Sequence, residues 1–379
     1  MQKSFRETAS FIIQVLISAT LLFICLAIVF NIPHSKVATA ILTVIIGVIF
    51  LLSYGKELHL IHYIVGGYIV ILDLWAYRNL DNMFSLSRSL FWVFLALAIG
   101  YLVERKKISY LTMLIPFLAI SALFTILMIF QIEQVDDGRL YYMNRNSIPV
   151  FSLSYGALMN VIWSRQHNSK PQIWPSILIL FLSFLSKSRI GLFASILYLI
   201  LNMMPYIIPV ASKFRKEWKL SKRKVIALIF LIIASAVIIL LLIKYSRFNT
   251  VGVSSNGRVK IIESYFSELT LRNFITGFNH TEIDKLLSKN LHNSFINLLM
   301  STGLLSAPVF VIYGIAGLKL FKKSYYLFGL FIILGIYSLV EKFIFFGIGD
   351  FILIPIIYLS FEASEQVTIL NHTDKEYNS

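Results

Sequence analysis

Two basic side chains interrupt an apolar stretch of the chain at residues 186–191, which read Ser-Lys-Ser-Arg-Ile-Gly. The apolar run before this turn covers residues 173–185, and a helix of 13 residues spans only about 20 Å, less than the ~30 Å hydrocarbon core of a membrane. We therefore expect Lys187 and Arg189 below the membrane surface, where a cation is costly unless it meets an anion or water. The turn could bind a phosphate group. The alternative is that both side chains extend to the membrane surface and bind no ligand.

A second basic group lies at the start of an expected amphipathic helix. Apolar residues share one face of residues 259–269, and Ser255 or Asn256 is the natural N-cap of this helix. The unpaired backbone amides at such a helix start, together with Arg258 and Lys260, favour the binding of a phosphate or pyrophosphate. Taken alone, an exposed arginine is more often simply solvated.

A histidine stands at the start of a later apolar run, residues 293–318. Positions 292, 295, 296, 299 and 303 share one helical face, so His292 lies above an apolar stripe that ends at Gly303. A neutral histidine at a membrane surface could abstract a proton from a sugar hydroxyl, because its unperturbed pKa lies near the working pH. Gly303 would let a neighbouring helix approach closely. The alternative for His292 is a structural side chain that bonds only to the backbone.

Helices that cross a membrane have to position these residues. Of the 379 residues 58% are hydrophobic and 14% charged, whereas soluble domains carry about 25% charged residues. Unbroken apolar runs such as residues 227–243 exclude the alternating pattern of a transmembrane β-barrel. The sequence therefore predicts an all-α, polytopic transmembrane helix bundle of about 12 helices. The expected spans are 11–30, 37–53, 60–77, 89–103, 109–130, 148–163, 173–186, 190–211, 225–243, 293–318, 325–340 and 343–360.

Basic residues in alternate loops predict the orientation of the bundle. Lysine and arginine concentrate in loops that this topology places in the cytoplasm with both termini. These loops are 105–107, 165–170, 212–224 and 322–323. They and anionic lipid account for the net charge of +15, so nucleic acid is not an expected partner. Residues 1–379 then form one membrane domain, with a long, partly helical outside loop at 244–291 and a short cytoplasmic tail at 362–379.

One cysteine and the absence of known metal spacings limit the chemistry. Cys25 lies inside the first expected helix, so neither a disulfide nor a cysteine-based metal cluster is expected. The sequence contains no Asp-x-Asp pair, no glycine-rich phosphate loop and no HExxH motif. We therefore expect neither a metal nor another cofactor.

The histidine motif and the basic turn resemble elements of the O-antigen polymerase and O-antigen ligase superfamily. His292 and Asn293, followed after nine residues by Gly303, resemble its histidine motif, which there also follows a long outside loop. Arg189 in the basic turn resembles its serine-arginine element at a helix junction. Ser306 departs from the motif, which usually has Gly, Thr or Tyr at this position.

Two further elements extend the resemblance, which covers mainly residues 139–305. Gly257 and Arg258 resemble the superfamily's glycine-arginine element early in the long loop. Arg145, with ten residues before Gly156, is similar to the arginine-to-glycine spacing of polymerases, although its counterpart in the long loop is missing. The glutamate that often follows the histidine in ligases is absent, which favours a polymerase.

The resemblance implies an inverting, metal-independent glycosyltransferase in the bacterial inner membrane, with its site facing the periplasm. It would transfer a glycan from undecaprenyl pyrophosphate to the acceptor repeat unit, whose hydroxyl His292 would deprotonate. Gly257 and Gly303 would be structural. The implied donor-binding or orienting residues are Arg189, Arg258, Lys187, Arg145 and Asn293.

Partners and competing functions follow from the same resemblance. The partners are the lipid-linked donor and acceptor and membrane lipid, and a chain-length regulator and a flippase are further candidates. One competitor is an O-antigen ligase that transfers the glycan to lipid A core. The other is a lipid-linked sugar flippase or another transporter, for which Asp73 is the clear candidate for an ionisable residue near the middle of the membrane.

Overall fold

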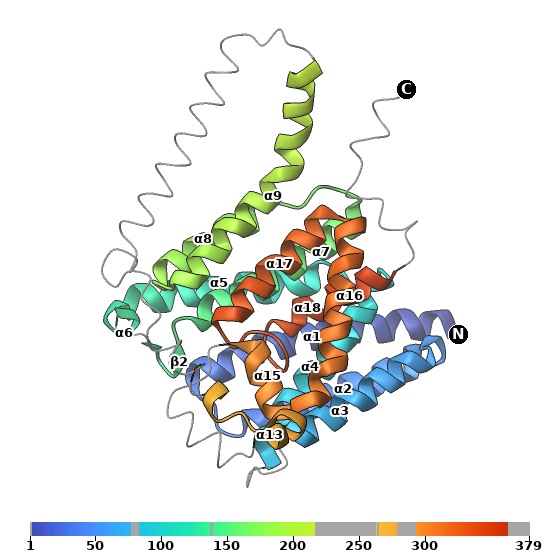
Figure 1. The fold of residues 1–379 in the computed structure, drawn as a ribbon. Helices are drawn as coiled ribbons and strands as arrows, with labels where there is room; N and C mark the ends of the chain where they lie inside the picture. The colour runs from blue at the N-terminus through green and yellow to red at the C-terminus, as the bar shows by residue number, and fades with distance from the viewer. Residues whose placement is uncertain are drawn as a thin grey trace.

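Helices make up most of the computed structural model, which describes residues 2–76, 83–136, 139–216, 263, 265–278 and 293–362 (Figure 1). The long helices of the first half are α1 (Gln2–Phe30), α2 (Ser35–Tyr54), α3 (Leu60–Ala76), α4 (Met83–Glu104), α5 (Leu111–Phe130), α7 (Ser147–His167), α8 (Trp174–Leu185) and α9 (Arg189–Lys216). The helices of the second half are α13 (Leu271–Thr276), α15 (Ser294–Thr302), α16 (Ala307–Lys323), α17 (Tyr325–Val340) and α18 (Asp350–Phe361). The short elements are the 3-10 turns η1 (Gly55–Glu57) and η2 (Gly303–Ser306), the helix α6 (Ile132–Asp136), and the antiparallel strands β1 (Arg139–Leu140) and β2 (Met143–Asn144).

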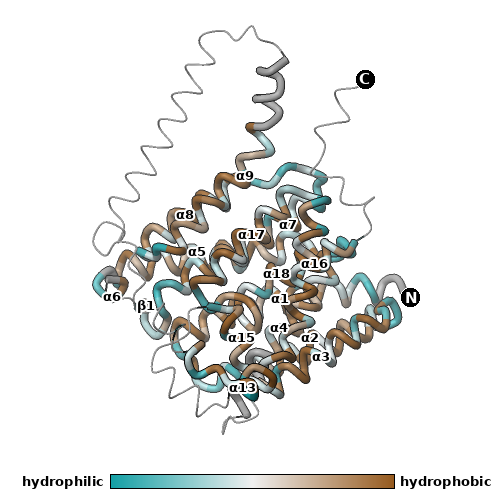
Figure 2. The backbone as a smooth tube through the Cα atoms, viewed as in Figure 1, coloured by the Kyte–Doolittle hydropathy of each residue, from teal (hydrophilic) through white to brown (hydrophobic). Residues whose placement is uncertain are grey.

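Five helices of the described part are long and apolar enough to cross a membrane. They are Arg6–Phe30, Ser35–Glu57, Leu111–Phe130, Arg189–Ile207 and Ser294–Lys323, the last of which counts α15, η2 and α16 together. Shorter apolar helices accompany them, among them α3, α8, α17 and α18. Apolar residues run along the helices in Figure 2, and hydrophilic residues gather at many of the turns that join them. By their length and composition, these helices indicate a polytopic helical membrane protein.

Most predicted spans coincide with helices, and two differ in part. Residues 293–318 lie almost wholly within the candidate span Ser294–Lys323, but the helix is broken there, because Gly303 has φ +57° and η2 separates α15 from α16. Residues 343–360 are not helical from their start, because 341–349 are irregular and α18 begins at Asp350. The predicted span 225–243 lies outside the described residues.

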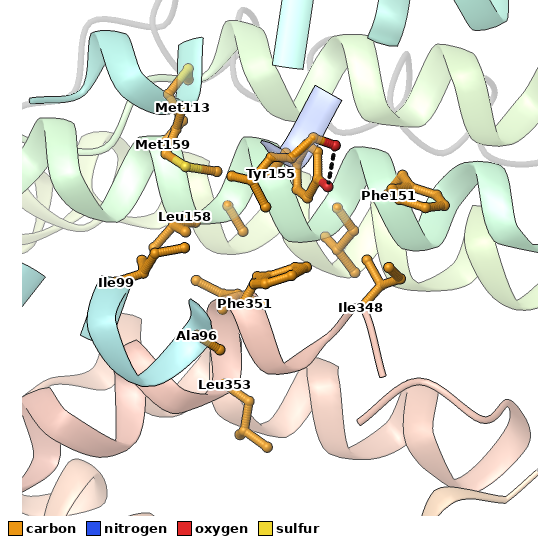
Figure 3. Packing of buried hydrophobic residues seen from close by; sticks show 14 of the residues in the cluster. Ala96, Ile99, Met113, Phe151, Tyr155, Leu158, Met159, Ile348, Phe351 and Leu353 are labelled. Atoms are coloured by element: carbon orange, nitrogen blue, oxygen red, sulfur yellow. Dashed lines mark hydrogen bonds between the residues drawn. The ribbon is translucent and has the colours of Figure 1, made fainter. Parts of the chain in front are cut away.

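The central helix is α7, which is buried on all sides. Every residue from Ile148 to Ile162 is buried, because α5, α8, α9 and α18 pack around it. Figure 3 shows Tyr155 of α7 beside Phe351 of α18. The hydroxyl of Tyr155 donates to the carbonyl oxygen of Leu21 at 3.0 Å. Neighbouring helices shield α7 from lipid, so it can carry more polar residues than the helices around it.

The helices alternate in direction, which gives the bundle two ends. At one end, which we call the Arg145 end, α7 and α9 begin and α17 stops. α1 also stops there, and the amide of Tyr142 donates to the carbonyl oxygen of Val29 near the end of α1. We call the opposite end the Arg165 end. α4 and α18 stop and α5 begins there, and Gln166 donates to the carbonyl oxygen of Ile108.

A buried ion pair closes the Arg165 end. The guanidinium of Arg165 donates through Nη1 and Nη2 to the two carboxylate oxygens of Glu362, both at 2.8 Å, and the side chains are only 9% and 6% exposed. Nη2 also donates to the carbonyl oxygen of Glu104, and Nζ of Lys323 donates to the carbonyl oxygens of Ser360 and Glu362. The predicted tail at 362–379 therefore begins with a residue that is anchored to the bundle.

Replacing Arg165 with methionine should lower the free energy of unfolding by about 3–5 kcal/mol, because Glu362 would remain buried without its partner. Arg6 provides the control, since its ion pair with Glu57 is 46% and 31% exposed and Arg6→Met should cost less than about 1 kcal/mol. Thermal unfolding of the purified proteins in detergent measures both changes. Equal melting temperatures of the two variants would contradict this role of Arg165.

Candidate functional site

The first turn of α9 packs directly against the first turn of α7. A Cβ atom added to Gly191 would lie 2.3 Å from Cγ and 2.6 Å from Cβ of Pro149. Only glycine allows the two helices to come this close. The contact brings the basic turn at Lys187 and Arg189 beside the residues that precede α7.

The basic turn lies at the end of a short helix, as its spacing predicts. α8 contains 12 residues, which span about 18 Å, and residues 169–173 before it are not helical. Lys187 takes the left-handed conformation with φ +53°, and it and Arg189 are partly buried. The positive end of the α9 dipole adds to these two cations. Such a turn favours an anion.

The residues before α7 are fixed to the end of α17. Arg145 is only 8% exposed, and its Nη1 donates to the carbonyl oxygen of Val135 at 2.8 Å. Asn146 donates through Nδ2 to Oε1 of Glu341 at 3.1 Å, and its carbonyl oxygen accepts from the hydroxyl of Tyr337, also at 3.1 Å. Asn146, the residue after Arg145, therefore binds the buried carboxylate of Glu341.

Asn293 attaches the start of α15 to the same end of α17. Its Oδ1 accepts from the backbone amide of Ile296 at 3.0 Å, which makes it the N-cap of α15. Its Nδ2 donates to the carbonyl oxygen of Leu339 at 3.1 Å. Both polar atoms of the side chain are used by the backbone, so Asn293 orients the chain at this point.

Ser294 holds the irregular segment 341–349 against α15. Its hydroxyl donates to the carbonyl oxygen of Glu341 at 3.0 Å and accepts from the amides of Phe343 at 2.8 Å and Ile344 at 3.2 Å. The hydroxyl is buried, so these amides are satisfied without water. The segment thus has a defined conformation and holds Glu341 in place.

Asp350 closes the other end of this segment. Its two carboxylate oxygens accept from the amides of Phe345 at 2.9 Å and Gly347 at 3.0 Å. Phe345 and Phe346 both take positive φ angles, of 59° and 69°, which are unfavourable for bulky residues. Such strain persists only where the surroundings impose it, and it concentrates at functional sites.

Gly303 receives the end of the short helix α13 and the residue that follows it, in a close approach that only glycine allows. A Cβ atom on Gly303 would lie 2.5 Å from both the amide nitrogen of Gly277 and the carbonyl oxygen of Ile275. Gly277 itself has φ +77°. The indole nitrogen of Trp75 donates to the carbonyl oxygen of Thr276 at 2.8 Å, which attaches the same segment to α3. Residues 275–277 are thereby held beside η2 and α15.

The Arg145 end thus gathers several residues that the sequence analysis selected. They are Arg145, Lys187, Arg189 and Asn293. Gly257, Arg258 and His292 lie outside the described residues.

Glu341 is a residue of this end that the sequence did not predict. It is 8% exposed, its side chain accepts from Asn146, and its carbonyl oxygen accepts from Ser294. An ionisable residue between the apolar runs 325–340 and 343–360 is the signal that could have identified it.

The function has to be inferred from the chemistry of this end. Comparison of the chain with models of protein families, with curated proteins and with solved structures finds no match. Within the described residues, no three side chains of His, Cys, Asp or Glu come together as metal ligands. The described groups are cations at helix starts, amide and hydroxyl donors and two buried carboxyl groups, a set that suits an anionic and hydroxyl-rich substrate.

Gly191→Ala should lower the free energy of unfolding by about 1–3 kcal/mol, because the added methyl group would overlap the ring of Pro149. Gly314→Ala on α16 is the matched control, since no heavy atom lies within 4 Å of its added Cβ. Alanine has the higher helix propensity, so the control should be neutral or slightly stabilising. Thermal unfolding in detergent compares them, and indistinguishable curves would mean that this helix contact is not tight.

Proposed function

We propose that this protein joins oligosaccharide repeat units carried on undecaprenyl pyrophosphate into O-antigen or capsular polysaccharide, at the outer face of the bacterial inner membrane. One observation supports this function best. Arg145, Lys187 and Arg189 meet at one end of the bundle with the start of α15, the helix that follows His292 in the chain. A base and a set of cations close together are what transfer from a pyrophosphate requires.

The opposite end of the bundle supports an outward-facing site. Basic residues lie around the Arg165 end, as is typical of the cytoplasmic side. They are Arg105, Lys106, Lys107, Arg165, Lys170, Lys322 and Lys323. The Arg145 end would then face outward, and twelve spans, both termini in the cytoplasm and the outside loop at 244–291 complete this topology.

The cations at the Arg145 end would hold the donor. Arg189 and Arg258 contact the two phosphates, because the planar guanidinium binds phosphate oxygens through paired hydrogen bonds. Lys187 and Arg145 add positive charge, and the start of α9 contributes its dipole. Their recessed position fits a pyrophosphate whose lipid chain stays in the membrane.

The transfer itself would be one displacement. The acceptor hydroxyl attacks the anomeric carbon as His292 takes its proton, and the bond from that carbon to the pyrophosphate oxygen breaks. The departing oxygen carries its electron pair into the cationic cluster, so no metal is needed to stabilise it. A single displacement inverts the anomeric configuration. Asn293 and Glu341 position the chain around His292.

The function is tested with purified protein and lipid-linked repeat units in detergent. We expect a ladder of lipid-linked polymers, and His292→Ala should lower the rate by about 100- to 10,000-fold. His34→Ala, at an exposed position at the start of α2, should retain the rate. Transfer only to added lipid A core would indicate a ligase. With the protein in vesicles, movement of the lipid across the bilayer without a new glycosidic bond would indicate a transporter. Wild-type rates in a folded His292→Ala variant would remove His292 from catalysis.

Arg189→Lys and Arg258→Lys should each raise the KM for the lipid-linked donor by roughly 10- to 100-fold, the value of one charge-assisted hydrogen bond of about 1.5–3 kcal/mol. The double variant should lose less than the product of the two single losses, because both residues act on one pyrophosphate. Arg105→Lys, at the opposite end of the bundle, is the control. Near-wild-type turnover in both single variants would refute the shared pyrophosphate site, and independent losses would indicate two separate sites.

A further inference from the structure

Asp73 is a buried carboxyl group with no partner in the described part of the chain. It lies on α3, is 0% exposed, and neither of its side-chain oxygens has a hydrogen-bond partner. Leu72 beside it is 1% exposed, whereas Ile71 and Leu74 are 55% and 50% exposed. The carboxyl group therefore points into the protein from a helix whose other face is apolar and exposed.

The elements around α3 offer Asp73 no counter-charge among the described side chains. α4 and α15 pack against α3, Tyr68 donates to the carbonyl oxygen of Leu305 in η2, and Trp75 donates to that of Thr276 in α13. α15 and η2 contain no charged residue. The charged residues of α4 and α13 are Arg88, whose side chain lies outside the described part, Glu104 at the far end of α4, and the exposed Arg272.

Other buried carboxyl groups in the bundle are satisfied. Asp350 accepts two backbone amides, Glu341 accepts from Asn146, and Glu362 pairs with Arg165. Each of these bonds stabilises an ionised carboxylate. Asp73 lacks every such bond in the described structure. If its carboxyl group were ionised, no described hydrogen-bond donor or counter-charge would replace the water that it loses on burial.

We propose that Asp73 is a proton-binding site whose carboxyl group is neutral in the folded protein. The ligand is a hydrogen ion, which removes the charge that the surroundings do not compensate. On α3 the site follows Tyr68 and precedes Trp75, whose side chains hold η2 and α13. Release of these contacts would admit water and let the carboxyl group lose its proton. This inference does not depend on the proposed glycan transfer.

Two measurements on the intact protein in detergent test the site. Infrared spectra at neutral pH should show the carbonyl stretch of a neutral carboxylic acid, and this band should weaken in Asp73→Asn. Asn keeps the shape of the side chain, and the melting temperature of the variant should stay near that of the wild type. A folded Asp73→Asn protein with an unchanged band would overturn the proposal.

The second measurement needs no variant. The proton of a neutral carboxyl group moves to a nitrogen of a hydrophobic carbodiimide, and the carboxyl oxygen bonds to its central carbon, so the whole reagent is added and nothing leaves. Peptide mass spectrometry should find the adduct on Asp73, in an amount that falls as the pH is raised, and not on Glu362, whose carboxylate is paired with Arg165. Absence of the adduct from Asp73, or an adduct on Glu362 alone, would overturn the proposal.

Discussion

Backbone amides and carbonyls of a non-helical segment inside a membrane need hydrogen-bond partners from the protein, because hydrocarbon offers none. The Arg145 end meets this requirement with two buried side chains. Ser294 bonds to three backbone groups at the start of segment 341–349, and Asp350 accepts two amides near its end. This segment carries Glu341 and joins the starts of α7 and α15, so the arrangement of the candidate site depends on these bonds.

Charge is used differently at the two ends of the bundle. Arg165 is neutralised by Glu362 through two hydrogen bonds of 2.8 Å and serves to anchor α18. Lys187 and Arg189 lie at the start of α9, where the helix dipole adds to their charge. The first arrangement stabilises the bundle, and the second places positive charge at a helix start.

Polarity also varies with depth in the bundle. α7 is buried at every residue from Ile148 to Ile162, and it carries serine and asparagine residues that its neighbours shield from lipid. Asp73 lies on a peripheral helix, yet its side chain faces inward without a described partner. A buried polar network can be fully satisfied, as around Ser294, or left to a ligand, as we propose for the proton at Asp73.

The sequence by itself determined the helical membrane class, the positions of most helices and the alternation of basic loops, because long apolar runs and charge are properties of single segments. The alternation of helices already predicts that Arg145, Arg189 and Asn293 share one end. Only the tertiary structure decided the break at Gly303 and the irregular segment 341–349, where an apolar run reads as helix. These features arise from contacts between segments far apart in the chain, such as the close approach of Gly277 to Gly303, which hydropathy does not encode.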